Sequence, residues 1–211
     1  MKKLNLLVAL LCLGLSTALA ENYKILFLNS SKIKINNKPA KVGSVFNEKA
    51  TIKWSEERQA MKVISTSSFK RYLMVAKLSE GREKTAYDIL TRNRHLSTHD
   101  NGQGIADPIL KLENNIANSY DLLDEIEIPS DLTIDEMHYF IGSYEYGDTK
   151  LTKKLKHNNQ NIIIDRSIFW VDGKKLDPRD INLTIDYIDG NIETPIYIKG
   201  DIEIIIIPEK L

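Results

Sequence analysis

Cysteine is nearly absent from this sequence, since Cys12 is the single one among 211 residues. It lies within the first twenty residues, which are predicted below to be removed, so the mature chain would contain no thiol. That excludes cysteine nucleophiles, thiolate metal sites, iron–sulfur clusters and disulfides from the mature protein. Lipidation of Cys12 is disfavoured as well, because Leu11 precedes it where a lipoprotein signal needs a small residue.

An excess of charge of one sign is also missing. The 29 lysine and arginine side chains equal the 29 aspartate and glutamate side chains, which argues against a nucleic-acid-binding tail. Charged residues make up 27% and hydrophobic residues 42% of the chain, as in a typical globular protein. No stretch beyond the N-terminus reaches eighteen apolar residues, so the sequence predicts no transmembrane anchor.

The N-terminus has the layout of a secretory signal peptide. Lys2 and Lys3 supply positive charge, residues 4–15 form a short apolar run, and residues 18–20 form the small-x-small cleavage site Ala-Leu-Ala. We therefore predict cleavage after Ala20, which makes residues 1–20 the signal peptide, and export to the periplasm, the outer membrane or the medium. The remaining 191 residues suffice for a core that stabilises one domain or two small ones without disulfides.

The residues after the signal peptide predict a mainly β protein with two modules. Residues 21–77 contain five or six short strands between close turns, which suits a small barrel-like module of the Src-homology-3 kind or a compact sandwich. Residues 119–211 contain about seven strands, with turn dipeptides at Gly147-Asp148, Asp172-Gly173 and Asp189-Gly190. This spacing predicts an antiparallel β-sandwich of immunoglobulin-like architecture.

Residues 78–118 are interpreted as a connector of helix and loop. One helix is expected from Ser79 to Arg92, with Ser79 as its N-cap, and residues 95–104 have the composition of a loop. Asp107-Pro108 predicts an N-cap followed by proline at the first helical position, which starts a short helix that ends near Asn115.

Several stretches resemble a group of uncharacterised exported proteins of Bacteroidales-type bacteria. The resemblance rests on six segments: IKINNKPAKVGSVF (33–46), IKW (52–54), QAMKV (59–63), RHLST (94–98), YDLLDEIEIP (120–129) and LTIDYID (183–189). It implies export into a Gram-negative envelope and an all-β fold. These segments are structural in character, so the resemblance implies no activity, substrate or binding residue.

His95, His99 and Asp100 are the best candidates for metal chemistry. Two histidines four residues apart on a helix can bind one metal ion. No glutamate lies between them to act as a base, and the turn-forming residues 101–104 follow at once, so a polar surface loop is the favoured interpretation. A second candidate is an oxygen-rich hairpin tip, made of Asp186, Asp189, Asn191 and Glu193.

Aromatic side chains gather in the second module. Tyr144 and Tyr146 have the same parity on one predicted strand, so they share a face with Phe140. Phe169 and Trp170 are adjacent and must point to opposite sides. Two interpretations remain open: these rings fill the core, or Tyr144, Tyr146 and Trp170 are exposed and stack on a sugar ligand.

Charge is unevenly distributed along the neutral chain. Residues 21–84 hold 14 basic and 6 acidic side chains, a net charge of +8, whereas residues 113–148 hold ten acidic and no basic side chains. Either these two segments dock on each other or on a partner, or each is a solvated face that protects strand edges.

The sequence favours an exported, non-enzymatic interaction or assembly protein of the bacterial envelope. It has no phosphate-binding glycine loop, nucleophile elbow or zinc-protease motif, and no cofactor is expected. The partner would be a protein or a glycan of the envelope and not a nucleic acid. A carbohydrate-binding module is the first alternative, and a metal-dependent hydrolase using His95, His99 and Asp100 is the second.

Overall fold

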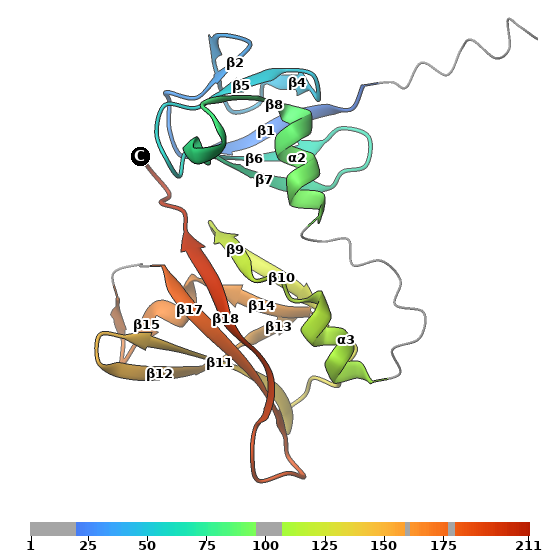
Figure 1. Cartoon of the computed structure of the whole chain (residues 1–211), viewed down its shortest axis with the longest axis vertical. Coiled ribbons are helices and arrows are strands. Elements are labelled where there is room, and N and C mark those ends of the chain that lie inside the picture. Colours follow the sequence, from blue (N-terminus) through green and yellow to red (C-terminus); the bar gives the residue numbers. More distant parts are fainter. Residues whose placement is uncertain (1–19, 96–106, 159–160, 177–179) are drawn as a thin grey trace, which may run out of the picture.

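The computed structural model describes residues 20–95, 107–158, 161–176 and 180–211. The protein is mainly β, as predicted, and its strands form two groups around separate hydrophobic cores (Figure 1). We call residues 20–95 the first unit and residues 107–211 the second unit. None of the helices in these ranges combines the length and the apolar character that crossing a membrane requires.

The first unit consists of two four-stranded sheets, with strand orders β4-β1-β6-β7 and β3-β2-β5-β8, and one α-helix. Its elements are β1 (Asn22–Leu28), β2 (Lys34–Ile35), β3 (Lys38–Pro39), β4 (Val45–Asn47), β5 (Thr51–Lys53), β6 (Ala60–Ser65), β7 (Arg71–Val75), the 3₁₀ helix η1 (Leu78–Glu80), β8 (Glu83–Thr85) and α2 (Ala86–His95). Both sheets and α2 contribute to one core. The sheets stay open among residues 20–95, so this unit is a compact two-sheet fold and not a closed barrel.

The second unit is a sandwich of a five-stranded sheet, β12-β11-β17-β18-β9, and a three-stranded sheet, β10-β14-β13. Its elements are α3 (Pro108–Asn115), β9 (Ser119–Leu122), β10 (Glu125–Pro129), β11 (His138–Tyr146), β12 (Thr149–Lys154), β13 (Lys156–Asn158), β14 (Asn161–Asp165), the 3₁₀ helix η2 (Arg166–Phe169), β15 (Trp170–Val171), β16 (Lys174–Lys175), β17 (Ile181–Asp189) and β18 (Ile196–Ile206). Isoleucines of both sheets share one core. The expected antiparallel order holds except that β18 and β9 pair in parallel.

Local chemistry explains several element boundaries. The Asp107 carboxylate accepts a hydrogen bond of 2.9 Å from the Ile109 amide, and Pro108 is the first residue of α3, as predicted. Gly147 and the pair Asp172-Gly173 adopt positive φ angles, which primed hairpin turns need.

The predicted primed turn at Asp189-Gly190 is not formed, because a longer loop joins β17 to β18. Gly190 is required there for a different reason. A Cβ atom on it would lie 2.9 Å from Cβ of Met137 and 3.2 Å from the Met137 carbonyl oxygen, so any other residue would force the backbone to shift.

The predicted helix from Ser79 is wrong in its first half. Gly81 ends the short helix η1 with a φ of +111°, and β8 then pairs with β5 before α2 begins at Ala86. Thr85 is the true N-cap: its hydroxyl accepts from the Asp88 amide at 3.2 Å, and the Asp88 carboxylate accepts from the Thr85 amide at 3.3 Å.

The described residues of the expected connector, 78–95 and 107–118, contribute side chains to both cores. Ala86, Ile89 and Leu90 pack in the first core, whereas Leu112 and Ile116 pack in the second. The two ends of the connector therefore belong to the units that they adjoin.

The two units touch through a third apolar cluster. It consists of Ala60, Val75, Leu123 and Ile207, with Phe27, Leu73 and Ile205 packed against them. Two ion pairs flank it, Lys62 with Asp124 and Arg58 with Asp180. The C-terminal residues return to the first unit, where the Leu211 amide donates to the Asn29 carbonyl at 2.8 Å (Figure 1).

Candidate functional site

The predicted aromatic surface does not form. Tyr144 is only 2% exposed, packs edge-on against Phe169, and donates a hydrogen bond of 2.6 Å to the Ile168 carbonyl. Phe140 is buried in the same core and Tyr146 packs against it. The shared face of this strand was predicted correctly, but it faces inward, because the opposite sheet of the sandwich covers it.

Trp170 has the exposed character that a stacking residue needs. Its side chain is 49% exposed, whereas that of the adjacent Phe169 is buried, so the two rings point to opposite sides as predicted. The Trp170 amide donates to the Ser167 carbonyl, and Trp170 pairs with Lys175 across the β15–β16 hairpin. The backbone of Trp170 is therefore fixed by the hydrogen bond to Ser167 and by the strand pairing with Lys175.

The predicted metal residues fall largely outside the described ranges. His95 is the last residue of α2, and His99 and Asp100 lie beyond the described residues. Within the described ranges, no group of three or more histidine, aspartate or glutamate side chains could hold a metal ion.

The oxygen-rich hairpin tip is engaged in local contacts. Asp189 accepts hydrogen bonds from Asn191 and lies 3.6 Å from Nε2 of His138. The other ring nitrogen of His138 contacts the Asp135 carboxylate at 2.8 Å, and this hydrogen bond lowers the pKa of Asp135. These contacts order the end of the sheet, and no converging ligand set forms there.

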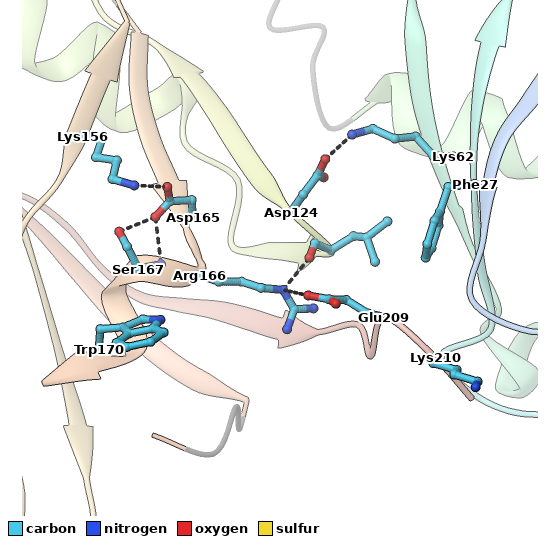
Figure 2. A pocket seen from close by; sticks show the side chains of 11 residues that line it. Phe27, Lys62, Asp124, Lys156, Asp165, Arg166, Ser167, Trp170, Glu209 and Lys210 are labelled. Carbon is cyan, nitrogen blue, oxygen red and sulfur yellow. Dashed lines mark hydrogen bonds and ion pairs between the residues drawn. The ribbon is translucent and has the colours of Figure 1, made fainter. Parts of the chain in front are cut away.

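A groove of about 700 Å³ lies at the junction between the two units (Figure 2). We call it the junction groove. The first unit contributes Phe27 and Lys62, and the C-terminal residues contribute Glu209 and Lys210. The sandwich contributes Leu123, Asp124, Lys156, Asp165, Arg166, Ser167 and Trp170. The surface of the junction groove therefore combines aromatic and aliphatic groups with side chains of both charges.

Two irregularities in the strands shape the junction groove. A bulge in β1 shifts the pairing register with β6 between Ile25 and Phe27, and Phe27 then lies opposite Lys62. The second irregularity is the corner at Leu123 and Asp124, where the chain leaves the five-stranded sheet after β9 and enters the three-stranded sheet at β10.

Lys62 and Asp124 join the two units across the groove. They form an ion pair and hydrogen bond, in which the Lys62 ammonium donates. Partial burial by itself would raise the pKa of Asp124. The hydrogen bond and positive charge of Lys62, together with backbone amides, outweigh burial and lower that pKa below its ordinary value.

Asp165 organises the wall that carries Trp170. It accepts from the Lys156 ammonium at 2.6 Å, from the Ser167 amide at 2.9 Å and from the Ser167 hydroxyl. Partial burial would raise the pKa of Asp165, but these hydrogen bonds outweigh it and lower the pKa. Asp165 is also the N-cap of η2, so one carboxylate orders both the ion pair and the helix that precedes Trp170.

Arg166 ties the end of the sandwich to the C-terminal residues. Its Nε donates to the Leu123 carbonyl at 2.6 Å, and its guanidinium also donates to the Ile207 carbonyl. Glu209 lies 3.8 Å from Nε on the groove side. Figure 2 shows the side chain of Arg166 between Trp170 and the C-terminal segment that carries Glu209.

Trp170 was predicted from the sequence as a binding residue, but the other residues that line the groove were not. One signal was present: the doublet Leu122-Leu123 interrupts an alternating pattern and marks the corner between β9 and β10. Both leucines are buried, Leu122 in the second core and Leu123 in the junction cluster. The other lining residues come from distant segments and have no shared motif.

Comparison with family models, with curated proteins and with solved structures found no match. The function must therefore be inferred from the chain's own residues and their geometry.

Proposed function

We propose that this protein is an exported, non-enzymatic binding protein of the bacterial envelope and that the junction groove holds its ligand or partner. The observation that carries the proposal is the groove itself, about 700 Å³ between two units, with the half-exposed Trp170 in its wall. Ligand sites commonly have volumes of roughly 300–1,000 Å³ and occur where domains meet.

The titratable groups in the groove favour binding over acid–base catalysis. A carboxyl group that acts as a general acid near neutral pH needs a raised pKa. The pKa values of Asp124 and Asp165 are lowered, because each carboxylate accepts a hydrogen bond from a lysine. Such groups stay ionised and are suited to positioning a ligand.

The charge distribution supports an interaction role. Lys62 belongs to the basic segment 21–84 and Asp124 to the acidic segment 113–148, and their ion pair brings the two segments together within one chain. Most acidic side chains of residues 113–148 are nevertheless exposed, and they would give a partner a negatively charged surface.

Export rests on the signal-peptide pattern and on the resemblance to exported envelope proteins. Glu21, the first residue after the predicted cleavage site, accepts hydrogen bonds from Tyr23 and Ser65 and so belongs to the first unit. N-terminal sequencing of protein from producing cells is expected to begin at Glu21, and a sequence that begins at Met1 would contradict export.

Binding can be tested by filling the groove. Ser167→Tyr places a ring in it, whereas Thr194→Tyr adds the same ring at an exposed loop between β17 and β18. Immobilised protein would be incubated with envelope extract, and retained proteins and glycans would be identified by mass spectrometry. Wild type and Thr194→Tyr should retain the same ligand, and Ser167→Tyr should lose it. The proposal fails if wild type retains nothing or if Ser167→Tyr retains the same material.

A further inference from the structure

We infer that the occupant of the junction groove is an uncharged oligosaccharide that stacks on Trp170. This inference rests on the proposed function, because it names the ligand class for the same site. Three properties of the groove carry it: the pairing of its charges, the hydrogen-bonding capacity that those pairs keep, and the exposed indole.

Six of the seven charged side chains that line the groove are matched with each other, and the seventh is Lys210 in the C-terminal segment. Lys62 pairs with Asp124, Lys156 with Asp165, and Arg166 lies near Glu209 while it donates to two carbonyls. Along the wall that carries Trp170 and at the Lys62–Asp124 pair, away from Lys210, a charged ligand would have to break these ion pairs or lie beside a like charge. An uncharged ligand can enter without either cost.

The paired side chains keep unused hydrogen-bonding capacity. A lysine ammonium has three donors and a carboxylate has about four acceptor positions. Lys156 donates one hydrogen bond to Asp165, and Asp165 also accepts from the amide and the hydroxyl of Ser167, so most but not all of its acceptor positions are used. Lys156 therefore presents donors next to a remaining acceptor position of Asp165 at the wall of the groove. A sugar hydroxyl both donates and accepts, and neighbouring hydroxyls on a ring match such alternating partners.

Trp170 supplies the apolar surface that sugar recognition also requires. An indole has an apolar face and a polar N–H, and one face of a pyranose ring consists mainly of C–H groups. The hydrogen bond to Ser167 and the buried Phe169 hold the backbone of this residue, so little flexibility is lost on binding. Leu123 and Phe27 extend the apolar surface along the groove.

Tryptophan fluorescence can test this inference directly. The protein has two tryptophans, and Trp54 is buried at 3% exposure, so Trp170 should dominate any change in emission on ligand binding. Suitable uncharged probes are cellohexaose, xylohexaose, mannohexaose and maltohexaose. Hexaglutamate and hexagalacturonate serve as the acidic peptide and the acidic glycan. At least one uncharged probe should change the emission in a saturable way, with an affinity that is nearly independent of salt.

The variants distinguish stacking from nonspecific association. Trp170→Ala, followed by calorimetry, should weaken binding roughly tenfold or more, and Trp170→Phe should lose less because it keeps a ring. Tyr197→Ala, an exposed aromatic outside the groove lining, should stay within about twofold of wild type.

Three results would overturn the inference: no uncharged probe binds at millimolar concentration, uncharged probes bind equally well to Trp170→Ala, or only the acidic probes bind and salt weakens them. The extract experiment is separate from these titrations. Retention of a protein that depends on the groove would keep the proposed function and reject the oligosaccharide.

Discussion

At the scale of single residues, Tyr144 was a candidate for stacking on a ligand but is part of the core of the sandwich. The side chain is buried, and its hydroxyl satisfies the carbonyl of Ile168, the residue before Phe169. Parity along a strand identifies which residues share a face. It does not say which face the opposite sheet covers.

Tyr144→Phe should destabilise the protein by about 1–2 kcal/mol, because the buried Ile168 carbonyl loses its donor. Urea denaturation would measure the free energy of unfolding. Tyr197→Phe is the matched control, since Tyr197 is 61% exposed and its change should have no measurable effect. Equal stabilities of wild type and Tyr144→Phe would contradict the role of this hydrogen bond.

The carboxylates of Asp124 and Asp165 should make the protein sensitive to acid. Their pKa values in the folded protein lie below the ordinary value of 3.8, so they contribute stability at pH values above about 4. This contribution is lost as the pH falls through the folded pKa values. The free energy of unfolding, measured from pH 6 to pH 2, should therefore fall on the acid side of pH 4.

Removing either partner of these pairs tests the cause. Asp124→Asn and Lys62→Gln should each flatten the acid limb, as should Asp165→Asn and Lys156→Gln. An unchanged acid limb in all four variants would show that other groups control it.

At the scale of elements, the N-cap of α3 and two of the three predicted hairpin turns are confirmed, whereas the N-cap at Ser79 and the primed turn at Asp189-Gly190 are wrong. α3 begins after Asp107 and ends at Asn115 as expected, because its N-cap depends on adjacent residues. α2 begins seven residues later than the predicted N-cap, Ser79, because β8 pairs with β5 first. A strand pairing formed over some thirty residues of sequence outweighed local helix propensity there.

Thr85→Ala should destabilise α2 by about 1 kcal/mol, since it removes the hydroxyl that accepts from the Asp88 amide. Thr85→Ser keeps the hydroxyl and should retain most of the stability. Thermal unfolding of the three proteins would measure the difference. Similar melting temperatures for Thr85→Ala and Thr85→Ser would contradict the capping role.

At the scale of the whole molecule, the junction is a narrow apolar contact with cavities beside it. Besides the junction groove, a smaller cavity of about 330 Å³ lies between the units near the Arg58–Asp180 ion pair. Relative motion of the units is therefore limited by a few polar contacts together with the apolar cluster.

Arg166→Met should loosen the C-terminal segment that reaches the first unit, because the Leu123 and Ile207 carbonyls of the second unit lose their donor. We expect a loss of about 2–4 kcal/mol in the free energy of unfolding and faster proteolysis of the C-terminal residues. Arg71→Met, at an exposed position of β7, is the matched control and should leave both measurements unchanged. Equal protease resistance of Arg166→Met and wild type would show that Arg166 does not hold the C-terminal segment in place.

The sequence by itself determined the mainly β class, most hairpins, α3 and the opposite directions of Phe169 and Trp170. These features depend on alternation, caps and turn residues that are neighbours in the chain. Only the tertiary structure decided that Tyr144 is core and that Trp170 faces a groove. It also brought Phe27, Lys62, Asp124, Asp165 and Glu209 to one place. Such a site depends on a bulge, a strand corner and the docking of two units, and no local pattern encodes the contacts between residues so far apart in sequence.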